Sequence, residues 1–61
     1  MRCEVGEADG GLRLDAFLAR TVPAMSRSRL KALIVDGAVS RLGQTIGDAG
    51  ARVKPGEVYE V

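Results

Sequence analysis

Residues 26–37, Ser-Arg-Ser-Arg-Leu-Lys-Ala-Leu-Ile-Val-Asp-Gly, predict one short helix with a capping residue at each end. Ser26 follows shortly after Pro23, and its side-chain oxygen can accept a hydrogen bond from a free backbone N–H of the first helical turn. Gly37 suits the other end, because helices commonly end on a residue with positive φ and glycine adopts that conformation without steric cost.

The predicted helix has an apolar sector and a basic edge when its residues are placed at about 100° steps around the axis. The apolar sector consists of Leu30, Leu33 and Ile34. Arg27 and Lys31, four residues apart, form a stripe along its edge, whereas Arg29 projects elsewhere. Basic residues beside an apolar face are often only a solvated flank whose stems cover the core, so the stripe alone allows two interpretations.

The distribution of charge favours the interpretation of the stripe as a binding surface. Between residues 13 and 31 the only acidic residue is Asp15, and the basic residues are Arg13, Arg20, Arg27, Arg29 and Lys31. Acidic residues outnumber basic ones in the rest of the chain, so the net charge is only +1. A basic segment inside a nearly neutral chain indicates a face that binds a polyanion.

The length and composition predict one small folded domain. A chain of 61 residues buries only about 60% of the surface that it exposes when unfolded, so we expect modest stability. The hydrophobic content of 46% nevertheless favours a folded unit over a disordered one. No apolar run is long enough to span a membrane, and the N-terminus lacks the apolar core of a signal peptide. We therefore expect a cytoplasmic protein. We also expect it to be a monomer.

The inventory of reactive residues argues against catalysis by this chain. Cys3 is the only cysteine, and there is no histidine to partner it or to form a triad or a common zinc site. The acidic residues are scattered without the spacing of metal ligands. We therefore expect no cofactor, no metal and no small-molecule substrate, and a binding module or a piece of a larger protein.

A first helix is predicted to begin near Leu12. One side of its helical wheel holds Leu14, Phe17, Leu18 and Thr21. Arg13 and Arg20, seven residues apart, share a flank of this helix. Asp15 falls in the first turn, where the helix dipole favours a negative charge, and a charge at a helix terminus is its expected role.

The two helices are expected to pack against each other. Pro23 separates them, because a proline disfavours helix in the residue before it, and such a short connection joins neighbouring helices. The predicted nucleus consists of Leu14, Phe17, Leu18, Leu30, Leu33 and Ile34. Burying each of these side chains contributes roughly 1.5–3 kcal/mol before entropy is subtracted.

The remainder of the chain predicts a small sheet. The strand-like stretches are residues 2–5, 38–42, 44–46 and 57–61. Residues 6–11 and 47–51 are predicted loops, and Pro55-Gly56 suits the two central positions of a type II turn. The fold class is therefore α+β, with two packed helices followed by a small, mostly antiparallel sheet.

The spaced combination of these motifs resembles the S-four RNA-binding domain, a family named after a ribosomal small-subunit protein. The matching residues are Gly11-Leu12-Arg13-Leu14-Asp15, Phe17-Leu18-Ala19, Ser26-Arg27-Ser28-Arg29, Ile34, Gly37, Val39, Gly43, Val53-Lys54-Pro55-Gly56-Glu57 and Val61. The resemblance covers residues 11–61 and leaves residues 1–10 as an N-terminal strand and loop. The spacing is most similar to the copy at the N-terminus of ribosomal RNA pseudouridine synthases of the large-subunit uridine type.

The resemblance implies a two-helix unit on a small sheet, the alpha-L motif, with structured RNA, expected to be ribosomal, bound across the helical face. The family's positions correspond to Arg13, Ser26, Arg27 and Lys31, with Arg29 and Lys54 as further candidates. Arg20 joins them from the shared flank, and Arg41 either adds a phosphate contact or is simply exposed. The chain departs from the family at Leu42-Gly43, where many relatives have Asn-Gly and where leucine tolerates positive φ poorly.

The expected mechanism is recognition of the RNA backbone by charge and shape. Arginines and lysine would contact phosphates together with a free N–H near Ser26. Tyr59 is the only aromatic candidate for base stacking, and it can equally be half-buried at the sheet edge. The tripeptide Arg13-Leu14-Asp15 looks like part of the catalytic motif of pseudouridine synthases, but it belongs to the binding module's own pattern, so no active site is expected in these residues.

Two alternatives to an N-terminal domain of a pseudouridine synthase remain open. A free-standing small ribosome- or tRNA-associated protein would be favoured by a stop codon directly after Val61 in the native gene. A protein-interaction module using the apolar helix faces would self-associate without RNA.

Overall fold

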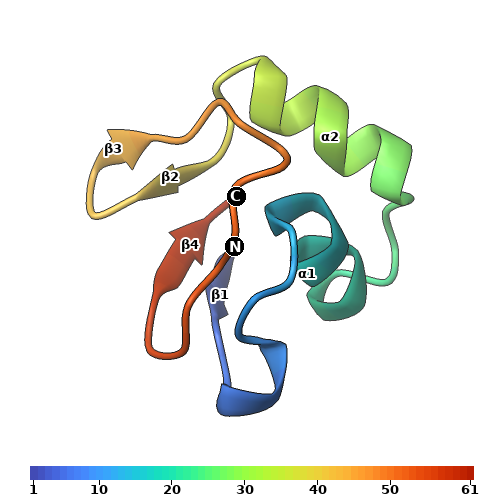
Figure 1. The fold of residues 1–61 in the computed structure, drawn as a ribbon. Helices are drawn as coiled ribbons and strands as arrows, with labels where there is room; N and C mark the ends of the chain where they lie inside the picture. The colour runs from blue at the N-terminus through green and yellow to red at the C-terminus, as the bar shows by residue number, and fades with distance from the viewer.

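Two helices cover one face of a small four-stranded sheet, and the core lies between the helices and the sheet (Figure 1). The computed structural model describes residues 1–61. In chain order the elements are β1 (Arg2–Glu4), the 3₁₀ turn η1 (Glu7–Asp9), α1 (Leu14–Thr21), α2 (Arg27–Val35), β2 (Ser40–Arg41), β3 (Gln44–Thr45) and β4 (Val58–Glu60). The predicted α+β class is confirmed. No helix is long and apolar enough to span a membrane.

Both predicted caps of α2 are confirmed. The Oγ of Ser26 accepts a hydrogen bond from the backbone N–H of Arg29 at 3.1 Å. Gly37 has a φ of 86°, and its N–H donates to the carbonyl of Ile34 at 3.1 Å. The N–H of Ala38 donates to the carbonyl of Leu33 at 3.0 Å. Together these two bonds form a Schellman motif, which stops the helix and satisfies two of its last carbonyls.

The first helix begins at Leu14, two residues later than predicted. Leu12 and Arg13 are instead extended and lie beside a distant segment: the N–H of Val53 donates to the carbonyl of Leu12 at 2.9 Å, and Arg13 forms a bridge with Arg52. The N–H groups of Leu14 and Asp15 donate to the carbonyls of residues 51 and 49, at 2.8 and 3.2 Å. Pairing with residues 49–53 therefore sets the start of α1.

The far end of α1 also differs from the helical wheel. Thr21 was placed on the apolar side but is exposed, and its hydroxyl donates to the carbonyl of Phe17 at 3.0 Å. Val22, the residue after the helix, is buried instead. A helical wheel assumes ideal geometry up to the last turn, and the chain leaves that geometry at Val22, whose φ is −121°.

The sheet has the strand order β1-β4-β2-β3, and all its pairs are antiparallel. Pairing of Cys3 with Tyr59 places β1 against β4, so the two ends of the chain lie side by side (Figure 1). Leu42 and Gly43 form the two-residue connection between β2 and β3, with φ of 52° and 75°. Positive φ at both positions is the requirement of a type I′ hairpin turn, and here leucine occupies the first of them.

The predicted turn at Pro55-Gly56 is confirmed. The N–H of Glu57 donates to the carbonyl of Lys54 at 3.1 Å, and Gly56 has a φ of 88°. A positive φ at the third residue of such a turn is the mark of type II. This turn leads directly into β4.

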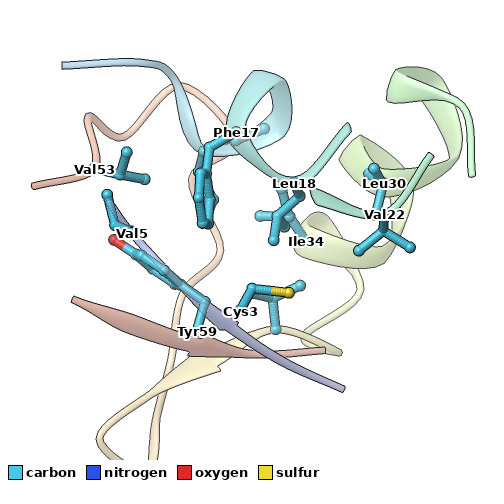
Figure 2. Close-up of a cluster of buried hydrophobic side chains, with 12 residues drawn as sticks. Cys3, Val5, Phe17, Leu18, Val22, Leu30, Ile34, Val53 and Tyr59 are labelled. Carbon is cyan, nitrogen blue, oxygen red and sulfur yellow. The ribbon is translucent and has the colours of Figure 1, made fainter. Parts of the chain in front are cut away.

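The core joins side chains from both helices and the sheet (Figure 2). Leu14, Phe17, Leu18, Leu30 and Ile34 of the predicted nucleus are fully buried, and Leu33 is half-buried. The ring of Phe17 meets the ring of Tyr59 with centroids 6.1 Å apart and tilted by 53°, a favourable arrangement for two aromatic rings. Tyr59 is only 3% exposed, so it is a core residue and is not available for base stacking.

Candidate nucleic-acid interface

Asp15 is the only charged residue buried in this protein, with 2% of its surface exposed. It lies in the first turn of α1, where the sequence predicted only a charge at a helix terminus. Its Oδ1 accepts hydrogen bonds from the backbone N–H of Ala16 at 2.8 Å and from Nε of Arg13 at 3.3 Å. The side chain of Arg27, the first residue of α2, reaches the same carboxylate. One carboxylate therefore joins the starts of both helices.

Each arginine contacts Asp15 through the same edge of its guanidinium. Arg13 uses Nε and Nη2, at 3.3 and 3.4 Å. Arg27 also uses Nε and Nη2, both at 3.4 Å. The Nη1 group lies on the opposite edge of a planar guanidinium and carries two further donors. The side chains are 43% and 56% exposed, so both arginines keep donors for a ligand.

Arg13 is supported from a second side. A Cβ added at Gly50 would lie 3.7 Å from Nη2 of Arg13, which places the guanidinium next to the backbone of the loop at residues 47–51. This loop also accepts the hydrogen bonds from the first N–H groups of α1. The loop that caps α1 therefore also helps to place the arginine that precedes it.

The carboxylate of Asp15 stays ionised in this environment. Burial raises its pKa, but the hydrogen bonds from Arg27 and from the N–H of Ala16, with the charges of Arg13 and Arg27, outweigh burial and leave the pKa below its ordinary value. Two guanidiniums and one carboxylate carry a net charge of about +1. We call these three residues, Arg13, Asp15 and Arg27, the shared-carboxylate cluster.

Two further predicted residues, Arg29 and Lys31, lie on α2 without an ion-pair partner. Arg29 and Lys31 are exposed and have no carboxylate within ion-pair distance, and Lys31 follows Arg27 by one helical turn. The Oγ of Ser26 is occupied as the helix cap. The N–H groups of Arg27 and Ser28 donate to no group of the chain, so the start of α2 offers free donors beside the shared-carboxylate cluster.

Three further predicted residues, Arg20, Arg41 and Lys54, do not contact Asp15. Nη1 of Arg20 lies 3.0 Å from a carboxylate oxygen of Asp9, which belongs to η1. Arg41 forms an ion pair with Glu57. The side chain of Lys54 is exposed. Of the eight candidate residues, only Arg13 and Arg27 are joined by contact of both side chains with a common partner.

Glu57 ties Arg41 into a structural network. Its Oε1 accepts from the N–H of Lys54 at 2.7 Å and from the hydroxyl of Tyr59 at 3.1 Å, and its Oε2 contacts Arg41. Burial raises the pKa of Glu57, but these hydrogen bonds and the charge of Arg41 outweigh burial and lower the pKa. Burial and the bond to Glu57 raise the pKa of the Tyr59 hydroxyl. Arg41 therefore holds the hairpin against the start of β4.

Sequence reasoning missed one member of the cluster, Asp15, and one residue beside it, Arg52. Asp15 was the only acidic residue among five basic ones, and that isolation was the available signal for its pairing. Arg52 was not chosen, although it precedes Lys54 by two residues. It is exposed, it bridges Arg13 through the backbone, and its Nη1 donates to the carbonyl of Gly11 at 3.1 Å. Arg52 thus adds a cation next to Arg13.

The interface is an open face, since the surface has no pocket.

Comparison with known proteins matches residues 12–58 to the S4 domain, the S-four domain of the resemblance above. The chain is also 42% identical over 53 residues to a protein of Synechocystis sp. described as an uncharacterized RNA pseudouridine synthase. That match covers 87% of this chain but 16% of the relative, so the chain spans about a sixth of the relative's length.

Proposed function

This chain belongs to the S4 domain family, and from that premise we propose that it binds folded RNA through the shared-carboxylate cluster and the start of α2. The observation that carries this proposal is the pair of arginines on Asp15, each with its Nη1 edge free. Arginine can bind a phosphate with two parallel hydrogen bonds, which gives direction as well as charge. Lys31, one turn further along α2, would contact a neighbouring phosphate.

Recognition of the RNA backbone is the mode that these residues support. Both aromatic residues, Phe17 and Tyr59, are buried, so no aromatic side chain is available to stack on a base. Hydrogen bonds to phosphates fix position and orientation without reading bases. The deep, narrow major groove of A-form RNA also excludes side chains from most base edges. We therefore propose binding by shape and charge, with weak dependence on sequence.

We propose further that the RNA is ribosomal and that the chain serves as the docking domain of an RNA pseudouridine synthase. The similarity to the Synechocystis protein supports this proposal. The catalytic step would belong to residues outside this chain. Asp15 lies buried between two arginines, where it has no access to a uridine, so the tripeptide at residues 13–15 supports binding and not catalysis.

A salt series with a folded fragment of large-subunit ribosomal RNA tests this proposal. For three or four phosphates, log affinity should fall with log salt at a slope of roughly −2 to −3. Lys31→Glu should weaken binding and reduce the slope by about one. Arg2→Glu is the matched control, because Arg2 is an exposed cation on β1 and the substitution changes the charge equally.

Two results would contradict the proposal. One is a salt slope near zero for the unaltered chain. The other is equal affinity of the Lys31→Glu and Arg2→Glu variants, which would mean that only total charge matters. Circular dichroism and thermal unfolding of each variant must show that it is folded under the binding conditions.

A further inference from the structure

We propose that Asp15 is a positioning residue for RNA binding, whose carboxylate holds Arg13 and Arg27 together as a two-armed phosphate clamp. This inference rests on the proposed function, because the clamp acts on an RNA phosphate. Asp15 itself would touch no RNA, since it lies behind both guanidiniums. Its effect on affinity would come entirely through the two arginines.

The burial of Asp15 exceeds what a helix-terminus charge requires. An acidic residue in the first turn interacts favourably with the helix dipole while it is exposed to water. Removing a carboxylate from water is costly, and the cost is offset only by good partners. Asp15 has three: the N–H of Ala16 and one guanidinium from each helix start. One arginine would suffice to neutralise it, so the second gives the cluster its positive surplus.

The contact distances indicate that both arginines are held but not saturated. Charge-assisted hydrogen bonds between guanidinium and carboxylate are typically about 2.7–2.9 Å long. The four contacts of Asp15 with its arginines are 3.3 to 3.4 Å long, which is longer than that range. Each guanidinium is therefore oriented by Asp15 and still attractive to another anion.

Orientation before binding should raise affinity. A free arginine side chain loses rotamer freedom when it binds a phosphate, and ordering two such side chains weakens binding by about tenfold. In this structure that ordering occurs when the protein folds. The oxygen Oδ1 of Asp15 contacts Nε of Arg13 and Nη2 of Arg27, so both guanidiniums meet at one atom. In this proposal they approach one phosphate together.

The substitution Asp15→Asn distinguishes a positioning role from a purely electrostatic one, because the two predict changes of opposite sign in RNA affinity. It raises the net charge from +1 by one unit, so a purely electrostatic account predicts tighter binding of RNA. The positioning account predicts binding about tenfold weaker, because the arginines lose the charge that orients them. Asp36→Asn is the charge-matched control. Asp36 is exposed at the end of α2 and pairs with no arginine, so this variant should bind as tightly as the unaltered chain or slightly more tightly.

A double-mutant cycle shows whether Asp15 acts through the arginines. The affinity for the ribosomal RNA fragment is measured for Asp15→Asn, for Arg13→Gln with Arg27→Gln, and for the triple variant. We expect the tenfold effect of Asp15→Asn to shrink below about twofold once both arginines are replaced. A merely structural Asp15 would lower stability in both backgrounds and leave the affinity of the folded fraction unchanged.

A measurement on the unaltered chain keeps the inference testable if Asp15→Asn fails to fold. The ¹⁵Nε relaxation of the arginine side chains should show Arg13 and Arg27 ordered in the free protein, and the exposed Arg29 mobile. Equal mobility of all three would overturn the inference, as would unchanged or tighter binding by folded Asp15→Asn. If the unaltered chain binds no RNA, the proposed function itself fails, which is a separate result.

Discussion

Leu42 holds the least favourable backbone conformation among the side-chain-bearing residues of this protein. It is the only residue other than glycine with a positive φ, and it is 94% exposed. A left-handed conformation costs an ordinary L-residue roughly 1–2 kcal/mol, and such an exposed side chain gains little from packing. Gly43 and Gly56 take the same sign of φ without that cost. The hairpin therefore forms despite Leu42 and not because of it.

Replacing Leu42 with asparagine should stabilise the protein by about 0.5–1 kcal/mol, because asparagine tolerates positive φ and suits the first position of a type I′ turn. Urea unfolding followed by circular dichroism measures the change. Leu42→Ala is the control: it removes the exposed apolar surface but keeps an ordinary L-residue at this φ. If the alanine variant gains as much stability as the asparagine variant, backbone conformation is not the cause.

The α2 helix depends on its caps more than on its composition. It is short, at nine residues, and isolated helices of that length are unstable in water. Ser26 satisfies the N–H of Arg29, and Gly37 with Ala38 satisfies the carbonyls at the other end. The caps also determine where Arg27 stands, because it is the first residue after Ser26.

Ser26→Ala should destabilise the protein by about 1 kcal/mol, since the N–H of Arg29 loses its acceptor. Thermal unfolding measures the shift. Ser28→Ala is the matched control in the same turn. Ser28 is exposed and its side chain caps nothing, and alanine has the higher helix propensity, so this variant should be as stable as the unaltered chain or slightly more stable. Equal losses in the two variants would show that the hydrogen bond to Ser26 contributes nothing.

Elements governed by local rules could be predicted from the sequence. Ser26, Gly37 and Pro55-Gly56 were assigned correctly, because caps and turns depend on residues three or four positions apart. The start of α1 was wrong, because Leu12 and Arg13 pair with residues some forty positions later. Nothing in the local sequence reports that pairing.

The candidate site was predictable in composition but not in arrangement. Basic residues near the start of α2 were found from charge and spacing. The sharing of Asp15 between Arg13 and Arg27 was not, because it depends on how closely two helices approach each other. Burial of Tyr59 likewise depends on its position opposite Phe17 across the core. Both features belong to tertiary packing.

Two carboxylates join segments that are separated in the sequence. Asp15 links the starts of α1 and α2, and Glu57 links the hairpin residue Arg41 to the start of β4. Both have a pKa below the ordinary value in the folded state. Such groups contribute stability above the pKa of the unfolded chain, and that contribution is lost as the pH falls towards the folded-state pKa.

The free energy of unfolding should therefore stay nearly constant from pH 7 to about pH 5 and fall below about pH 4, where carboxylates of the unfolded chain take up protons. Urea titrations across this range measure it. Asp15→Asn should show a shallower fall at acidic pH, because one of the two carboxylates is gone. Glu4→Gln, which replaces an exposed carboxylate on β1, should keep the full fall. Parallel profiles for the two variants would contradict this role of Asp15.

The pairing of β1 with β4 brings the two ends of the chain together, with the N–H of Val61 bonded to the carbonyl of Met1 at 2.7 Å (Figure 1). Bringing together the ends of a loop of about 60 residues costs about 3.5 kcal/mol in chain entropy before any contact offsets it. The connection at residues 22–26 between the helices closes at far smaller cost. We therefore expect the parts of the fold to form at different times. The pair of helices that carries the arginines can assemble early, because its contacts are local in sequence. The pairing of β1 with β4 forms later, because it needs the two ends of the chain to meet.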